Sequence, residues 1–374
     1  MKIRIRILSI LAPIIALFTA VLICSAILNF IDRDPIETFR SMFEYGTTGK
    51  SMVSIINRSV PLYISAVAVA VGFKMGLFNI GVEGQYLLGA LIAAAIGAYF
   101  TLPPVIHVLF ILFIASLSSG LWAAIAGYLK VKKGIHEVIS TIMLNYIGTG
   151  IIAYLLAQVF FERDENDSLK VPQTNYLPES GQIPPLNNLL GIEDLPNLHG
   201  FVIGAILIGI FYYWLIWKTS LGYDLRATGS NPIAAKFSGA DPAKLIILAM
   251  LISGAIAGMV GMSGLMGYYH RYTIDFTSGL GFVGIGVALL GRNHPIGMAL
   301  GAILISFLER SSQILDLKDV PKEIERIMQG IIILFVVIGY EIVRRYILTS
   351  QIKEASKEVS VSYTHLTLPT ILLV

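Results

Sequence analysis

Acid and amide side chains interrupt an otherwise apolar stretch, Gly76–Tyr86, which reads GLFNIGVEGQY. Asn79, Glu83 and Gln85 stand there among three glycines. Burying a carboxylate in a membrane costs about 2.5–3.5 kcal/mol on insertion scales, so such a group usually has a bonded partner or lies on a solute or ion path. A pairing or pathway role for Glu83 is therefore one hypothesis. The alternative is structural, with Glu83 capping a broken helix.

A second group of polar residues, Glu137, Ser140, Thr141 and Asn145, follows helical spacing at the start of the fifth apolar run, 137–161. Residues three and four apart share one face of a helix, so three or four of these side chains can meet the same neighbour. Interhelical hydrogen bonding is one interpretation. The other is that the face lines a solute path, and for it we single out Thr141 and Asn145.

The stretch Gly222–Pro242 predicts a short helix between two longer ones. Asn231-Pro232 and Asp241-Pro242 each place a capping side chain before a proline at the first helical position, and Gly239 can end the short helix. Such a helix would offer a partner a small apolar face made of Ala234, Ala235 and Phe237. A plain loop helix resting on the membrane is the alternative.

Two motifs resemble nucleotide sites without their context. Gly46–Ser51 ends like a P-loop, but Glu44 stands where the first glycine belongs and no strand precedes it. Gly279-x-Gly281-x-x-Gly284 fits a dinucleotide fingerprint, but it lies in an apolar segment without a βαβ unit. We expect close helix packing there, as for Gly254-x-x-x-Gly258 and Gly297-x-x-x-Gly301.

Enzyme chemistry has little support in the sequence. The six histidines are scattered without metal-ligand spacing, and the single cysteine, Cys24, excludes an intramolecular disulfide and cysteine-based metal clusters. Neither a nucleophile elbow nor a complete ATP site is present. Any energy source must therefore be a coupled ion or another subunit.

The composition places these motifs in a membrane. Of 374 residues, 55% are hydrophobic and only 14% are charged, against about 25% in soluble domains. Runs of about 20 apolar residues predict an all-α polytopic protein with about ten transmembrane helices. They fall at 7–30, 52–72, 76–99, 105–128, 137–161, 200–217, 244–265, 273–291, 295–312 and 324–343. Glycine and polar residues interrupt the spans 76–99 and 273–291, so we expect these two to be broken or re-entrant.

Charge predicts the orientation. The first apolar run is too long for a signal peptide, so we interpret it as a retained helix. With the N-terminus in the cytoplasm, ten spans place both termini there, with 16 of the 27 Lys and Arg residues inside and 17 of the 24 Asp and Glu residues outside. This agrees with the excess of basic residues in cytoplasmic loops of membrane proteins.

We expect one membrane domain and a tail. The domain covers 1–350, with an acidic, proline-rich and mostly irregular external loop at 162–199 and a cytoplasmic loop at 218–244. Residues 351–374 form the cytoplasmic tail. Its last part, Ser360–Val374, shifts abruptly to Thr and Leu, resembles a sequencing or assembly artefact and is assigned no function.

An internal repeat at an offset of 188 is faintly visible. Ile64-Ser65 and Gly76-Leu77 align with Ile252-Ser253 and Gly264-Leu265. An odd number of predicted spans separates the two copies, so they would run in opposite directions, as in inverted-repeat transporters.

Four segments together resemble the permease subunits of bacterial ATP-binding-cassette (ABC) importers for branched-chain amino acids and simple sugars. The similarity is strongest with the nucleoside-uptake branch and covers about residues 1–350. The segments are Gly76–Gln85, Gly134–Tyr146, Arg226–Gly239 and Ala288–Pro295.

The resemblance implies a bacterial plasma-membrane permease of ten helices with two inverted repeats. Its implied partners are a second, similar permease, two cytoplasmic ABC ATPase subunits, an external solute-binding lipoprotein and membrane lipid, but no nucleic acid. ATP and Mg²⁺ would bind to the ATPase subunits, so this chain is expected to hold no cofactor and to be no enzyme. By this resemblance, Asn231–Ser238 would be the coupling helix that docks on the ATPase. Asn79, Glu83 and Gln85 would lie at the broken helix beside the translocation path. The implied coupling positions are Gly229, Asn231, Pro232, Ala234, Ala235 and Gly239.

Rival functions stay open at this point. Nothing in the sequence reads a base, a ribose or a carboxylate, so the same machine carrying a monosaccharide or a branched-chain amino acid is the first rival to nucleoside import. An ion-coupled secondary transporter, in which Glu83 titrates or holds a cation, is the second. An integral membrane enzyme is disfavoured because no acid–base or metal constellation appears.

Overall fold

The computed structural model describes residues 2–160, 171–192, 194–318, 320–321 and 323–363. Within these ranges the chain forms helices joined by irregular segments, and the one β feature is an isolated bridge between Gln173 and Thr273. The predicted all-α fold is confirmed. The chain forms two compact units, one of Met1–Phe39 with Val320–Val374 and one of Arg40–Asp319.

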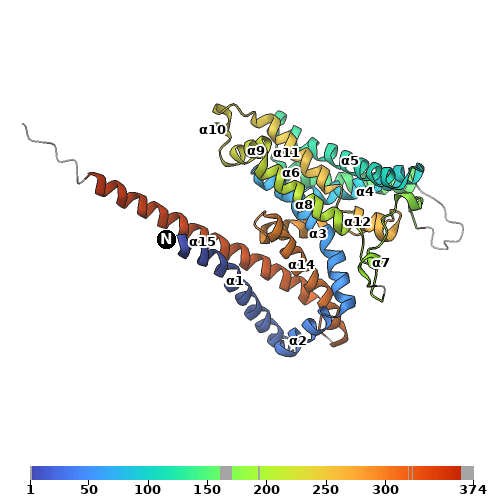
Figure 1. Ribbon diagram of the computed structural model, residues 1–374, viewed down its shortest axis with the longest axis horizontal. Helices are drawn as coiled ribbons and strands as arrows, with labels where there is room; N and C mark the ends of the chain where they lie inside the picture. Colours follow the sequence, from blue (N-terminus) through green and yellow to red (C-terminus); the bar gives the residue numbers. More distant parts are fainter. Residues whose placement is uncertain (1, 161–170, 193, 319, 322, 364–374) are drawn as a thin grey trace, which may run out of the picture. The chain divides into compact units, whose positions relative to one another are not determined.

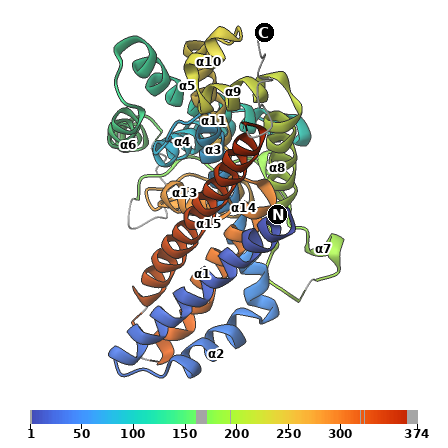
Figure 2. The same cartoon turned by 90° about the vertical axis from the view of Figure 1, so that its left-hand side faces the viewer.

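The smaller unit is built on α1 (Lys2–Phe30) and α15 (Glu323–Tyr363), which lie side by side (Figures 1 and 2). The side chain of Asp34 caps the start of α2 (Pro35–Gly46), because its Oδ1 accepts from the amide of Ile36 at 2.8 Å. The helix α15 continues into the predicted tail. Of the segment assigned no function, residues 364–374 lie outside the described residues.

Eight helices of the described chain are long and apolar enough to cross a membrane. They are Gly49–Lys74, Val82–Tyr99, Pro104–Lys133, Glu137–Val159, Phe201–Lys218, Pro242–Tyr269, Pro295–Lys318 and Glu323–Ile347. Two shorter apolar helices, Leu17–Phe30 and Leu280–Leu290, fall at the remaining predicted spans. The polytopic fold is therefore confirmed, whereas the count of ten stays a prediction.

The helix α3 (Gly49–Lys74) is the centre of the larger unit. Every residue from Ser59 to Gly72 is buried, which happens when protein surrounds a helix on all sides. The helices around it come from distant parts of the chain: α8 (Phe201–Lys218), α11 (Pro242–Ala257), α13 (Leu280–Leu290) and α14 (Pro295–Ser311).

Small residues bring α11 against α5 (Pro104–Lys133), and the two run side by side in Figure 1. A Cβ atom on Gly254 would lie 2.4 Å from the Cβ of Ala123, and one on Gly258 would lie 2.3 Å from the carbonyl oxygen of Ala115. The spacing Gly254-x-x-x-Gly258 thus serves helix packing, as the sequence predicts.

Both spans predicted to be broken are irregular at their N-terminal ends. The helix α4 (Val82–Tyr99) starts after seven non-helical residues, 75–81, and α13 starts after Gly279, whose φ is +88°. The 11 residues of α13 rise about 17 Å, well short of the roughly 30 Å of a hydrocarbon core. A Cβ on Gly281 would lie 2.5 Å from the amide nitrogen of Glu83, so the fingerprint-like glycines serve close packing.

The shorter elements complete the larger unit. In order they are α6 (Glu137–Tyr154), η1 (Leu155–Val159), η2 (Glu179–Gly181), α7 (Asn187–Leu190), α9 (Ser220–Ser230), α10 (Pro232–Phe237), α12 (Met262–Gly264), η3 (Leu265–Tyr269) and η4 (Ser312–Lys318). The described part of the loop 162–199 contains only η2 and α7, as predicted, while residues 161–170 and 193 lie outside the described chain.

Candidate functional site

The carboxylate of Glu83 holds the start of α13. Its Oε1 accepts from the backbone N–H of Gly279 at 2.6 Å, and its Oε2 accepts from that of Gly281 at 2.8 Å. The hydroxyl of Tyr86 donates to Oε1 at 3.2 Å. A carboxylate at a helix N-terminus satisfies unpaired amide groups and is stabilised by the helix dipole. These contacts are those of the structural alternative, a cap on a broken helix.

Asn79 and Gln85 bond to each other through both ends of their amides. Each donates to the other at 3.0 Å, and neither side chain is more than 1% exposed. Asn79 also donates to Ser253 at 2.9 Å and accepts from the amide of Gly81 at 3.0 Å, while Ser253 donates to the carbonyl of Ala68 at 2.6 Å. The pair therefore ties the irregular segment before α4 to α11 and α3.

The polar face of α6 holds the same irregular segment from the other side. Asn145 donates to the carbonyl of Ile80 at 3.0 Å and accepts from the amide of Gly84 at 2.9 Å. Glu137 pairs with Lys130 and accepts from the amide of Phe78 at 3.3 Å. The interhelical hydrogen bonding predicted for this face is thus present.

All five residues predicted for the path meet around residues 78–85. The last of them, Thr141, donates to the carbonyl of Glu137 at 2.7 Å and lies against Gly81, where an added Cβ would meet it at 3.1 Å. None of the five lines the cavity that the N-terminal half of α3 forms with residues 260–269 and 276–280. A direct contact of the five with solute remains a prediction.

Both predicted helix starts in the loop 218–244 are confirmed. The side chain of Asn231 accepts from the second and third amides of α10, both at 3.0 Å, and that of Asp241 does the same for α11 at 3.1 and 3.3 Å. The hydrogen bond from the Lys244 amide is the main cause that lowers the pKa of Asp241. Gly239 follows α10 with a φ of +94°.

The exposed face of α10 differs from the prediction at one residue. Ala235 is only 4% exposed because it packs on the chain's own helices, whereas Ile233 is 71% and Phe237 is 89% exposed. Ala234 is exposed as predicted. Each residue turns a helix by about 100°, which places Ala235 opposite the face that its neighbours share. The apolar face therefore consists of Ile233, Ala234 and Phe237.

Gly229 joins this region to the end of α3. A Cβ atom on Gly229 would lie 2.5 Å from the carbonyl oxygen of Lys74, and one on Gly76 would lie 3.2 Å from the carbonyl oxygen of Gly229. Gly76 itself has a φ of +72°. Two backbones are in direct contact here, one at the end of α9 and the other at the start of the segment that holds Asn79.

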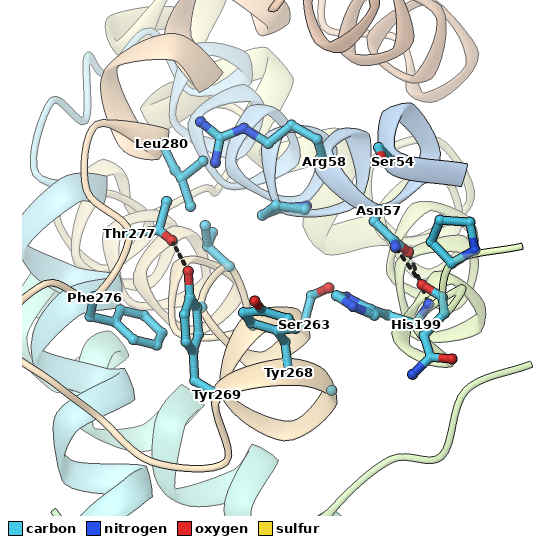
Figure 3. Close-up of a pocket in the computed structure, with 17 residues that line it drawn as sticks. Ser54, Asn57, Arg58, His199, Ser263, Tyr268, Tyr269, Phe276, Thr277 and Leu280 are labelled. Atoms are coloured by element: carbon cyan, nitrogen blue, oxygen red, sulfur yellow. Dashed lines mark hydrogen bonds between the residues drawn. The ribbon is translucent and has the colours of Figure 1, made fainter. Parts of the chain in front are cut away.

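A cavity of about 460 Å³ opens at the other half of α3 (Figure 3). Its walls are the N-terminal half of α3, residues 196–199, the α12–η3 region and residues 276–280. Small-molecule sites in proteins measure roughly 300–1,000 Å³, so the cavity can hold a solute of that class.

Aromatic rings form one wall of the cavity. The rings of His199 and Tyr268 are stacked, with centroids 6.1 Å apart and planes 28° apart. The ring of Tyr269 lies edge-on to that of Tyr268, with centroids 4.9 Å apart, and tilted to that of Phe276, with centroids 5.6 Å apart. The Tyr269 hydroxyl oxygen is 3.1 Å from that of Thr277. Figure 3 shows these rings in a row along one side of the cavity.

Contacts from α3 position this wall. The side chain of Asn57 donates to the carbonyl of Asn197 at 2.7 Å and accepts from the amide of His199 at 2.9 Å. Burial, aided by nearby His270, lowers the pKa of His199, so its ring is neutral at pH 7. The result is an uncharged polar edge beside the rings.

Charge in the cavity is compensated. Arg58 is the one charged residue of the lining, and two of its guanidinium nitrogens lie 2.8 Å from the two carboxylate oxygens of Glu309. Such a two-point pair leaves little positive field for an anion. Among the described residues, no group of three or more His, Cys, Asp or Glu side chains could hold a metal ion.

The cavity and the Glu83 contacts share one segment. Thr277 lines the cavity, and its carbonyl accepts from the hydroxyl of Tyr86 at 2.9 Å, two residues before the amide that Glu83 binds. Glu83 and Tyr86 therefore bond to the segment that forms this part of the cavity wall.

Sequence reasoning missed the residues that line this cavity. Asn57 and Arg58 interrupt the apolar run 52–72, and this polar pair is the signal that could have identified them. The aromatic residues at 268–276 gave no such signal, because aromatic side chains are common at membrane interfaces.

Comparison with known proteins identifies similar chains. Residues 51–337 match the family described as "Branched-chain amino acid transport system / permease component". The guanosine ABC transporter permease protein NupP of Bacillus subtilis is 38% identical over 77% of this chain and 81% of its own length. The nucleoside ABC transporter permease protein NupB of Lactococcus lactis is 29% identical over 88% and 91%.

A third relative is named for a different solute. The glucose ABC transporter permease protein TsgB13 of Haloferax volcanii is 28% identical over 89% of this chain and 88% of its own length. Bacillus subtilis and Lactococcus lactis each contain a second, more distant match named for guanosine or nucleosides. No solved structure matches the chain.

Proposed function

Because the chain belongs to the family of permease components of branched-chain amino acid transport systems, we propose that it forms the translocation path of an ABC importer for nucleosides. The main support for a nucleoside cargo is the 38% identity to a guanosine permease over 81% of that protein's length. The polytopic helical fold and the cavity between its helices support a role in transport.

Uptake by intact cells tests the cargo. Cells with and without this chain are given labelled guanosine, glucose and leucine in parallel. We expect guanosine uptake alone to depend on the chain. A dependence of glucose or leucine uptake alone would replace the nucleoside assignment with the rival that the glucose relative suggests.

The energy source is tested separately. An ABC importer should lose uptake when its ATPase is inactivated and keep it when ion gradients are collapsed but ATP is maintained. Uptake that survives without the ATPase and fails without the ion gradient would support an ion-coupled secondary transporter instead.

The proposed partners are a second permease, two ABC ATPase subunits and an external solute-binding lipoprotein. Two relatives of one organism are named as guanosine permeases, at 38% and 25% identity to this chain, which supports a second permease subunit. We place the complex in a bacterial plasma membrane with both termini in the cytoplasm.

The exposed face of α10 is the proposed contact with the ATPase. A partner shifts a conformational equilibrium only by binding its two states unequally, so ATP-driven movement needs such a contact. We expect Phe237→Glu to abolish uptake without changing the amount of permease in the membrane, because Phe237 is 89% exposed and contributes little to the fold. The control Phe237→Leu keeps an apolar contact and should retain most uptake. Normal uptake by Phe237→Glu would contradict the docking role.

A further inference from the structure

We propose that the cavity beside His199 and Tyr268 is a binding site for the base of a nucleoside during its passage through the permease. The inference rests on the proposed function and extends it by naming the place and the contacts. It is drawn from the shape, the aromatic wall, the unpaired polar groups and the charge of the cavity (Figure 3).

The aromatic wall offers a stacking surface. Tyr268 is 66% exposed, so most of its ring is open. The rings of His199 and Tyr269 hold it in place, with centroids 6.1 and 4.9 Å from that of Tyr268. Flat bases bind to such rings by stacking, with little dependence on which base is bound. A base on the open side of Tyr268 would extend the row of rings.

Polar groups without partners stand near this surface. The hydroxyl of Ser263 lines the cavity, is only 2% exposed and forms no hydrogen bond with any residue that the structure describes. Buried hydroxyl groups are normally hydrogen-bonded, so an unpaired one facing a cavity indicates a ligand. The side-chain amide of Asn197 also lines the cavity and can donate or accept.

The charge of the lining favours an uncharged solute. Arg58 is held by both oxygens of Glu309, and the ring of His199 is neutral. A nucleotide would bring phosphate, and an amino acid would bring a carboxylate and an ammonium, to a cavity without a free counter-charge. A hexose would need hydrogen-bond partners for several hydroxyl groups, whereas the polar side chains of Ser54, Asn57, Arg58 and Thr277 already bond within the protein.

Direct binding to the assembled importer tests the site. The purified complex in lipid nanodiscs, without the external binding protein, is titrated with labelled guanosine. We expect Tyr268→Leu to raise the dissociation constant about tenfold, because one stacking surface is lost. Ser263→Ala should raise it several-fold, since one hydrogen bond is lost. Tyr268→Phe keeps the ring and should bind nearly as wild type does.

The controls separate this inference from the proposed function. Tyr146→Leu removes another tyrosine, 75% exposed on α6, and should leave binding unchanged. Guanosine import by cells together with wild-type affinity in Tyr268→Leu would overturn the site while the function stands. A wild-type complex that binds no guanosine, in cells that import it, would also overturn the site. Cells that import no nucleoside would overturn the function itself.

Discussion

Glu83 illustrates how a buried carboxylate can be stabilised without a cation. Two backbone amides and one hydroxyl donate to its oxygens at 2.6–3.2 Å, and both amides belong to the start of α13. Hydrogen bonds to an ionised acceptor are stronger than neutral ones. The side chain thus joins α4 to a helix whose first residue lies almost 200 positions later, and its main effect should be on stability.

Replacing Glu83 tests this reading against a pathway role. We expect Glu83→Gln to lower the free energy of unfolding by about 2 kcal/mol, because the amide group of glutamine can accept from only one of the two backbone donors and loses the charge. Thermal melting of the purified permease measures the effect. The matched control Glu44→Gln changes an acid that is 63% exposed and should leave melting unchanged. Unaltered melting in Glu83→Gln together with altered ion dependence of uptake would favour the secondary transporter.

His199 gives the cavity a predictable pH dependence. Burial and His270 lower its pKa below the usual value of about 6.5, so the ring is neutral above that pH and gains a proton only below it. The unfolded chain binds this proton first, so the stability that the neutral ring contributes is present above about pH 6.5 and decreases as the pH falls.

The affinity for guanosine should depend on the protonation of His199. We expect affinity to be constant from about pH 7.5 to 6.5 and to fall below that range, because a protonated ring no longer accepts a hydrogen bond and is costly to bury. Titration of the reconstituted complex at several pH values measures this. His199→Gln should remove the decline, and an identical pH profile in the variant would contradict the assignment.

At the residue scale the sequence indicated which side chains matter but not what they contact. Glu83, Asn79 and Asn145 stand out because polar groups in apolar runs are rare. Their partners, such as Gly281 and Ser253, lie on helices far along the chain, so only the folded structure identifies them. Ala235 was misplaced for a local reason, since a helix of six residues has too little pattern to fix which face is exposed.

At the element scale, the contact between α9 and the end of α3 is a backbone junction. The glycine at 229 lets the two chains approach, because any side chain would meet the carbonyl of Lys74 at 2.5 Å and the carbonyl carbon of Met75 at 2.7 Å. Backbone cannot move aside as the end of a flexible side chain can. The proposed coupling region and the irregular segment before α4 are therefore positioned together.

Gly229→Ala should separate the end of α9 from the end of α3. We expect guanosine uptake to fall at least tenfold, with lower thermal stability, because the added methyl group forces the backbones apart. Gly150→Ala is the matched control, since a Cβ there would meet nothing within 4 Å. Uptake and melting are measured for both variants. Wild-type behaviour of Gly229→Ala would show that the junction tolerates separation and transmits no movement.

The elements themselves were largely predictable. Hydropathy located the apolar helices, and proline after Asn231 or Asp241 located two helix starts, because both signals are local. The length of α13 was not predictable, because Gly279, with a φ of +88°, and the carboxylate of Glu83 set its first turn. The apolar run alone does not show where α13 begins, because its first turn is set by a side chain from another helix.

At the scale of the whole larger unit, α3 connects the two regions of interest. Arg58 lines the cavity and Lys74 contacts Gly229, and their separation of 16 positions spans about 24 Å along the helix. The cavity and the coupling region therefore lie at opposite ends of one buried helix. For an importer this arrangement requires the cavity to open to the outside and α10 to face the ATPase in the cytoplasm.

Cysteine labelling tests that orientation, because the chain has a single cysteine, Cys24, to remove. In a Cys24→Ser background, Glu179→Cys and Ser238→Cys each place one thiol at an exposed position, near the cavity end and after α10 respectively. We expect a membrane-impermeant maleimide to label the first variant on intact cells and the second only after permeabilisation. The basic residues assigned to the α10 side predict this result. The reverse pattern would invert the permease in the membrane and place the cavity on the cytoplasmic side.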